Sequence, residues 1–288
     1  MNVVLPNDAD LLPPSNDSIF KTLLTHPNAK PALIGIASAV IERKVTDVVV
    51  RNNELPTMDI EEKNERFGVN CVVDDGDQVD IEMHGAHIEE PITGAHISLL
   101  NKSIYYLTDL HSSQKSKGVK YGDLVRTYQA TFCSYTVYPN HPDYITRASL
   151  RRENGELISD QINFVMVELS KLSSILDKPT HELSDIEAWS IFLQYASDVQ
   201  KRGLVNRIIK ERGEIAVAGA LLLEISQDER ERAKFRSRRM FETDQISNIL
   251  TAEDRKAKTI ARRMKQAGKS MLEIMEFTEL SLTEVEQL

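Results

Sequence analysis

Three residues that could do chemistry, Asp80, Glu82 and His84, alternate along one short stretch of this 288-residue chain. Apolar residues fill the positions between them, and the stretch follows Asp75-Gly76, a pair that is typical of a tight β-hairpin turn. Side chains along a strand point alternately to opposite faces, so we expect these three on one face. Acidic side chains on one face of a central strand predict a cleft that holds a divalent cation.

Each acidic residue also has a structural explanation. Asp74, Asp75 and Asp77 are ordinary turn residues. Near the start of the chain, Asp17 would cap the first helix. Glu82 is expected to be buried in a central strand, and a buried carboxylate needs a partner. The alternative to a metal or site role is therefore a structural ion pair.

Four segments of the chain form an ordered set of motifs. They are Asn16-Asp17-Ser18-Ile19-Phe20-Lys21; Lys63 followed by Ile81-Glu82-Met83-His84; Lys102-Ser103-Ile104-Tyr105-Tyr106-Leu107 with Lys117-Gly118-Val119-Lys120-Tyr121; and the tail from Met264 to Ser270 onward. Their order and spacing resemble the PD-(D/E)XK nuclease superfamily and, more narrowly, its family of nuclease-type transposases or recombination-promoting nucleases. Members of that family carry D-x-x-F-K, I-E-M-Q, R-x-x-x-Y and G-x-x-Y at the first three places and a closing helical pair at the fourth.

The resemblance implies an α/β fold in which helices flank a mixed sheet, and a metal-dependent DNA endonuclease associated with recombination or mobile elements. It assigns catalytic roles to Glu82, His84, Asn70 and Asp17, and metal ligation to Glu82, Asn70 and Asp80. The implied cofactor is Mg²⁺ or Mn²⁺, bound through carboxylates and substrate phosphate oxygens. Lys21 would lie near the site on the first helix, and DNA is the implied partner.

The chain departs from the family pattern at three places. Asn70 stands where an Asp is usual, His84 where Gln or Lys is common, and Lys102 where Arg is usual. The first two fall on the expected catalytic core, so it is left open whether the chain is an enzyme. The alternatives are a nuclease-fold protein that binds DNA or a protein partner without cleaving, and a structural or partner-binding protein with no affinity for DNA.

Charge is distributed unevenly along the chain, whose net charge is −9. Residues 1–100 carry 7 basic and 17 acidic groups, whereas residues 201–270 carry 18 basic and 10 acidic groups. A basic stretch is the electrostatic footprint of phosphate binding, and a solvated helix face is the alternative. The candidate DNA-binding residues are Lys21, Lys102, Arg236, Arg238 and Arg239.

The resemblance implies a nuclease-like α/β core over residues 10–175, and the change to helical periodicity predicts a helical region with a basic stretch over 176–288. Helices are expected over 17–24, 32–41, 97–116, 208–225 and 228–265, and strands over 128–138, 144–151 and 162–169. Residues 45–51 are expected to form a strand or an extended connector. Capping boxes at Ser184-Glu187, Ser270-Glu273 and Ser281-Glu284 predict three more helix starts.

The remaining composition describes an ordinary globular protein, with 41% hydrophobic and 27% charged residues. No run approaches the ~18 apolar residues of a transmembrane helix, and the N-terminus lacks the pattern of a signal peptide. Cys71 and Cys133 form neither a disulfide framework nor a metal motif, which favours a cytoplasmic location. Self-association is also expected.

Overall fold

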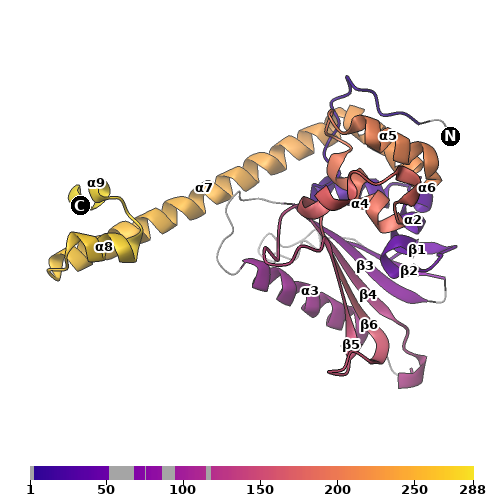
Figure 1. Cartoon of the computed structure of the whole chain (residues 1–288), viewed down its shortest axis with the longest axis horizontal. Coiled ribbons are helices and arrows are strands. Elements are labelled where there is room, and N and C mark those ends of the chain that lie inside the picture. The colour runs from indigo at the N-terminus through magenta and orange to yellow at the C-terminus, as the bar shows by residue number, and fades with distance from the viewer. Residues whose placement is uncertain (1–2, 52–67, 75, 86–94, 115–117) are drawn as a thin grey trace. The chain divides into compact units, whose positions relative to one another are not determined.

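The computed structural model describes residues 3–51, 68–74, 76–85, 95–114 and 118–288 (Figure 1), with 95–98 and 238–252 described by their backbone alone. The chain divides into two compact units, Met1–Phe235 and Arg236–Leu288.

The described strands of the first unit form one mixed sheet in the order β1-β2-β3-β4-β6-β5. They are β1 (Val48–Val50), β2 (Val69–Val73), β3 (Asp77–His84), β4 (Thr127–Cys133), β5 (Ile145–Arg151) and β6 (Leu157–Glu168). β4 runs parallel to both β3 and β6, and the other neighbours are antiparallel. The expected α/β fold with a mixed sheet is confirmed, and β3, which carries Glu82, lies in the interior of the sheet.

The hairpin of β2 and β3 sets the register of the predicted site. The turn residues Asp74 and Gly76 have positive φ angles of 24° and 95°. Positive φ angles are typical of the tight turn of a β-hairpin. The Asp74 carboxylate accepts a hydrogen bond from the Thr46 amide at 2.9 Å, so it has a structural role. In the resulting register Asn70 pairs with Asp80 and not with Glu82.

The two faces of the sheet differ in polarity. One face is apolar and packs against α1 (Asp17–Thr25) and α2 (Lys30–Ile41), with α4 (Asp185–Tyr195) and α6 (Gly213–Gln227) packed on α2. Buried residues on this face include Val69, Cys71, Val79, Ile81, Met83 and Phe132. Figure 1 shows α2, α4 and α6 on one side of the sheet and α3 (Ala95–Ser112) on the other.

Helix α3 covers β4 and β6 on the second face. A smaller apolar cluster, which includes Leu99, Leu107, Phe164 and Met166, joins the helix to these strands. Among them the Ser103 hydroxyl lies 3.3 Å from that of Thr131, and both side chains are fully buried. The face of the sheet that α3 covers therefore also carries polar side chains of β3 and β4.

The first helix begins with a different cap from the one expected. Asn16 is the N-cap residue, since its Oδ1 accepts hydrogen bonds from the amides of Ser18 and Ile19. Asp17 is the first residue of α1, where a carboxylate is stabilised by the partial positive charge of the helix N-terminus. The expectation that Asp17 caps the helix is therefore wrong by one residue.

The expected continuous helix over 208–225 is also wrong, because the chain breaks at Arg212. α5 (Arg202–Glu211) ends there, Arg212 is extended (φ −128°, ψ 109°), and α6 begins at Gly213. The Arg212 guanidinium donates to the Leu183 carbonyl oxygen and lies 3.6 Å from Asp185, so long-range contacts hold the break in place.

The remaining described helices are three 3₁₀ turns, which were not predicted from the sequence, and three α-helices, which were. They are the 3₁₀ turns η1 (Tyr121–Asp123), η2 (Leu169–Ile175) and η3 (Thr180–Glu182), and α7 (Glu229–Gln266), α8 (Met271–Thr278) and α9 (Leu282–Glu286). The three predicted capping boxes are confirmed at the starts of α4, α8 and α9. None of the helices in the described ranges is both long and apolar enough to span a bilayer.

The second unit has a small core of its own. Buried Ala261 on α7 packs with Ile274, Leu280 and Val285 from the segment that contains α8 and α9. The Lys265 ammonium donates to the Val285 carbonyl oxygen at 3.1 Å, which satisfies one of the acceptors at the end of α9.

Candidate functional site

Strand β3 directs Asp80, Glu82 and His84 to the face of the sheet that α3 shares. Glu82 is only 1% exposed although it is a carboxylate on an interior strand. His84 Nε2 lies 3.1 Å from Glu82 Oε2, a hydrogen bond between alternate residues of one strand. The other carboxylate oxygen, Glu82 Oε1, is buried and has no hydrogen-bond partner within the described residues. Half of this buried carboxylate is thus available to a ligand.

Gly68, just before β2, gives the two carboxylates of β3 their space. A Cβ at Gly68 would lie 2.7 Å from Glu82 Cγ and 2.9 Å from Asp80 Oδ1. Both side chains therefore lie over the bare backbone of this glycine and near each other. Our sequence analysis missed Gly68, although an isolated glycine at a strand is a known signal of close approach.

We predict that Gly68→Ala disrupts this arrangement. Because the new methyl group would overlap the buried stem of Glu82, it should lower stability by about 1–3 kcal/mol and weaken Mn²⁺ binding about tenfold. Calorimetric titration with Mn²⁺ and thermal unfolding measure the two effects. Gly203→Ala is the control, since a Cβ there meets nothing within 4 Å; equal Mn²⁺ affinity in both variants would contradict the prediction.

Strand β4 adds polar groups beside those of β3. Gln129 pairs with Asp80 and Thr131 with Glu82, so all four side chains share a face. Gln129 is fully buried, and neither atom of its amide has a hydrogen-bond partner in the described part of the chain. Leaving such an amide unsatisfied costs about 1–3 kcal/mol per group. Sequence analysis missed this residue too, although Gln129 and Thr131 alternate with apolar neighbours.

The donors around Glu82 fit a hard divalent cation. The carboxylates of Asp80 and Glu82 and the amide of Asn70, opposite Asp80, are oxygen donors of the kind that Mg²⁺ and Mn²⁺ prefer. The described residues contain no group of three or more His, Cys, Asp or Glu placed to hold a metal. A cation here would therefore rest on two carboxylates with neutral oxygens and water, a set that Mg²⁺ commonly uses.

The sequence of the chain matches one protein family, described as PD-(D/E)XK nuclease family transposase, over residues 14–252. The chain belongs to this family. The match covers the whole sheet with its flanking helices and supports a nuclease-type function. No curated protein and no solved structure matches the chain.

In this nuclease-family chain, some of the residues predicted for the site do not lie beside Glu82. Asp17 is buried, and its Oδ1 accepts a hydrogen bond from the Ser18 amide at 2.8 Å. Its helix packs on the apolar face, opposite to the one that carries Glu82. No hydrogen bond or ion pair among the described residues joins Asp17 to Glu82 or Asp80. Lys21, on the same helix, is half-buried.

Helix α3 carries the segment that resembles the family's R-x-x-x-Y motif, with Lys102 in place of the Arg. The Lys102 ammonium lies 5.4 Å from the centre of the Tyr106 ring, one helical turn away, in a cation–π contact. The neighbouring Ser103 contacts Thr131, the partner of Glu82 on β4. α3 therefore places Lys102 at the level of Glu82 along the sheet.

Other predicted residues belong to the second unit or lie outside the described residues. Arg236 is exposed at the start of the second unit. Arg238 and Arg239 follow on α7, where the structure describes only the backbone. Lys63 and Lys117, which contribute to the family motifs, lie outside the described residues.

The two cysteines are buried, Cys71 in the main apolar core and Cys133 in the smaller cluster beside α3. Burial, together with the charges of Glu168 and Glu82, raises the pKa of the Cys133 thiol far above its usual range. Burial and the nearby Asp80 charge raise the pKa of Cys71 to about 12. Both thiols stay protonated at neutral pH, so oxygen donors dominate the site.

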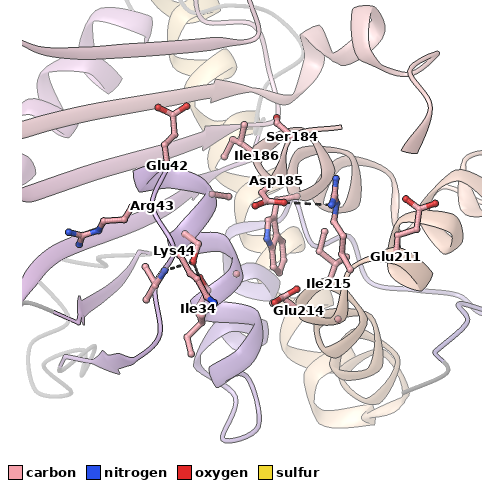
Figure 2. Close-up of a pocket in the computed structure, with 17 residues that line it drawn as sticks. Ile34, Glu42, Arg43, Lys44, Ser184, Asp185, Ile186, Glu211, Glu214 and Ile215 are labelled. Carbon is pink, nitrogen blue, oxygen red and sulfur yellow. Dashed lines mark hydrogen bonds and ion pairs between the residues drawn. The ribbon is translucent and has the colours of Figure 1, made fainter. Parts of the chain in front are cut away.

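A cavity of about 650 Å³ lies in the helical layer, between the end of α2, the start of α4 and the junction of α5 and α6 (Figure 2). Trp189 and Ile215 form part of its apolar wall, and charged residues such as Glu42 and Arg43 stand at its border. None of the residues predicted for the site lines it. The candidate site is therefore the polar face of β3 and β4.

Proposed function

We propose that this chain is a DNA endonuclease that depends on Mg²⁺ or Mn²⁺ and acts in recombination or on mobile elements. The observation that carries the proposal is Glu82. Its carboxylate is buried on an interior strand, close to Asp80, with one oxygen unsatisfied among the described residues. His84 is the structural partner of this carboxylate and contacts only its Oε2, so Oε1 is the oxygen that a cation would bind.

The residues of the site have separate roles in this proposal. Asp80 and Glu82 would hold the cation, with Asn70 as a neutral donor, and a cation bound there would supply charge to polarise the phosphate and to lower the pKa of a water. His84 orients that water: with Nε2–H donated to Glu82, Nδ1 is the ring nitrogen left to accept a proton. The water oxygen bonds to phosphorus, the phosphodiester P–O bond breaks, and solvent protonates the leaving oxygen. Asp17, at the start of α1 on the apolar face, contributes through the packing of that helix and not at the cation.

In this proposal both regions of the chain, residues 10–175 and 176–288, contact DNA. Residues 10–175 carry the chemistry, with Lys102 contacting phosphates from α3 on the Glu82 face and Lys21 contacting the DNA from α1. Residues 176–288 contribute the basic stretch, including Arg236, Arg238 and Arg239. Phosphate contacts of this kind predict binding that weakens steeply as salt concentration rises. We further propose a cytoplasmic protein that self-associates.

A second candidate function follows from two residues. Asn70 removes one negative charge from the metal site, and His84 replaces the Gln or Lys that is common in the family. Together they favour a nuclease-fold protein that binds DNA, or a protein partner, without cutting. A third class, a structural protein with no affinity for DNA, is favoured by the acidic N-terminal part.

Cleavage of supercoiled plasmid separates these functions. The protein is incubated with plasmid and Mg²⁺ or Mn²⁺, beside a sample with chelator, and binding to a duplex is measured from low to high salt. Metal-dependent nicking supports the nuclease. Salt-sensitive binding without nicking supports the second candidate, and the absence of both supports the third.

A further inference from the structure

The partners of β4 on the α3 side differ from one residue to the next. Thr127 is satisfied, since Gln114 Nε2 donates to its hydroxyl at 2.9 Å and His111 Nδ1 lies 3.0 Å from it. Thr131 is likewise within 3.3 Å of the Ser103 hydroxyl. Gln129 lies between these two threonines and is fully buried, yet its Oε1 and Nε2 have no partner in the described ranges of the chain.

The unsatisfied amide of Gln129 lies beside the carboxylates of β3. Gln129 pairs with Asp80 in the parallel register, and Glu82 is the next residue on the same face. Gln114 shows that an amide between α3 and β4 can be fully bonded: it donates to Val125 O at 3.0 Å and accepts from Val125 N at 2.8 Å. Gln129 differs because it lies beside two carboxylates and near the space that the missing side chain of Gly68 leaves. A cation and its waters in that space would give the amide its hydrogen-bond partners.

We propose that Gln129 is a further oxygen donor to the divalent cation held by Asp80 and Glu82. This inference rests on the proposed function, because it requires that the carboxylates bind a cation. Its Oε1 would supply an oxygen to the cation or to a water of its hydration shell. Gln129 therefore adds a donor without adding charge, at a site where Asn70 is also neutral.

Binding of Mn²⁺ to the full-length protein tests the proposal without reference to cleavage. Gln129→Met keeps the length of the side chain and removes both polar atoms, so we expect about 10–100-fold weaker Mn²⁺ binding in calorimetric titration. Gln129→Glu adds a charged donor and should bind Mn²⁺ more tightly than the native chain. Thermal unfolding without metal shows that each variant is folded. If Gln129→Met does not fold, Gln129→Asn, which withdraws the amide by one methylene, is measured in its place.

Gln78→Met is the matched control. Gln78 is also buried on β3, shares the same face and has an Oε1 without a partner among the described residues, but it pairs with Thr127, away from Glu82. Its Mn²⁺ affinity should stay within about twofold of the native value, since Gln78 lies four residues from Glu82 along β3 and Gln129 lies opposite Asp80.

Glu82→Gln distinguishes the inference from the function on which it rests. Weak Mn²⁺ binding in Glu82→Gln with native affinity in Gln129→Met would overturn the role of Gln129 and leave the nuclease proposal standing. Native affinity in Glu82→Gln, or no Mn²⁺ binding by the native chain, would overturn both. Equal losses in Gln129→Met and Gln78→Met would also overturn the inference, because they would show a general effect of the buried amides.

Discussion

Replacing Glu82 with Gln is expected to lower metal-dependent plasmid nicking by a factor of about 10³ or more. The substitution keeps the size of the side chain but removes the charge that holds the cation, and the loss of several kcal/mol of transition-state stabilisation corresponds to a change of this size. In the absence of metal the same variant should be at least as stable as the native chain, because Glu82 is a buried carboxylate with one unsatisfied oxygen. Nicking rates and thermal unfolding measure the two expectations.

The control is a second buried carboxylate that lies away from the site. Glu187 on α4 is 4% exposed and accepts hydrogen bonds from Lys178 Nζ at 2.6 Å and the Tyr144 hydroxyl at 3.0 Å. Glu187→Gln should lose stability, since both contacts weaken, yet keep its nicking rate. Nicking that survives in Glu82→Gln would remove the basis of the proposed function.

Asn70→Asp is expected to increase metal-dependent nicking by about 10–100-fold, and to create it if the native chain has none. Asn70 pairs directly with Asp80 on the neighbouring strand. An Asp here restores the residue that is usual in the family and gives the cation a third carboxylate. The measurement is the nicking rate over a range of Mg²⁺ concentrations, where the variant should reach its maximum rate at lower Mg²⁺.

Stability provides an independent readout for Asn70→Asp. Three carboxylates that face one another repel, so the variant should unfold at lower temperature than the native chain without metal. Binding of a cation to the folded state reverses this, and Mg²⁺ should raise its unfolding temperature more than that of the native chain. Asn154→Asp adds the same charge in an exposed turn, where neither effect is expected. An unfolding temperature in Asn70→Asp that does not respond to Mg²⁺ would contradict the ligand role of position 70.

Local patterns were enough to predict much of the fold. The alternation around Asp80, Glu82 and His84 has a period of two, so it assigns them to one face of a strand whatever that strand pairs with. Capping boxes such as Ser184-Glu187 act over three residues and correctly marked helix starts. Arg212 shows the limit of local patterns: the apolar periodicity continues through it, and only contacts with Leu183 and Asp185 explain the break.

The residues that surround Glu82 were decided by long-range pairing. The hairpin register sets Asn70 against Asp80, and the short turn that fixes this register depends on contacts of Asp74 with Thr46. Parallel pairing with β4 brings Gln129 beside Asp80 across 49 positions of the chain, a juxtaposition that no local period encodes. The sequence by itself therefore determined which residues of β3 could do chemistry. Only the tertiary structure decided what lies beside them, because neighbours across strands depend on register and not on spacing along the chain.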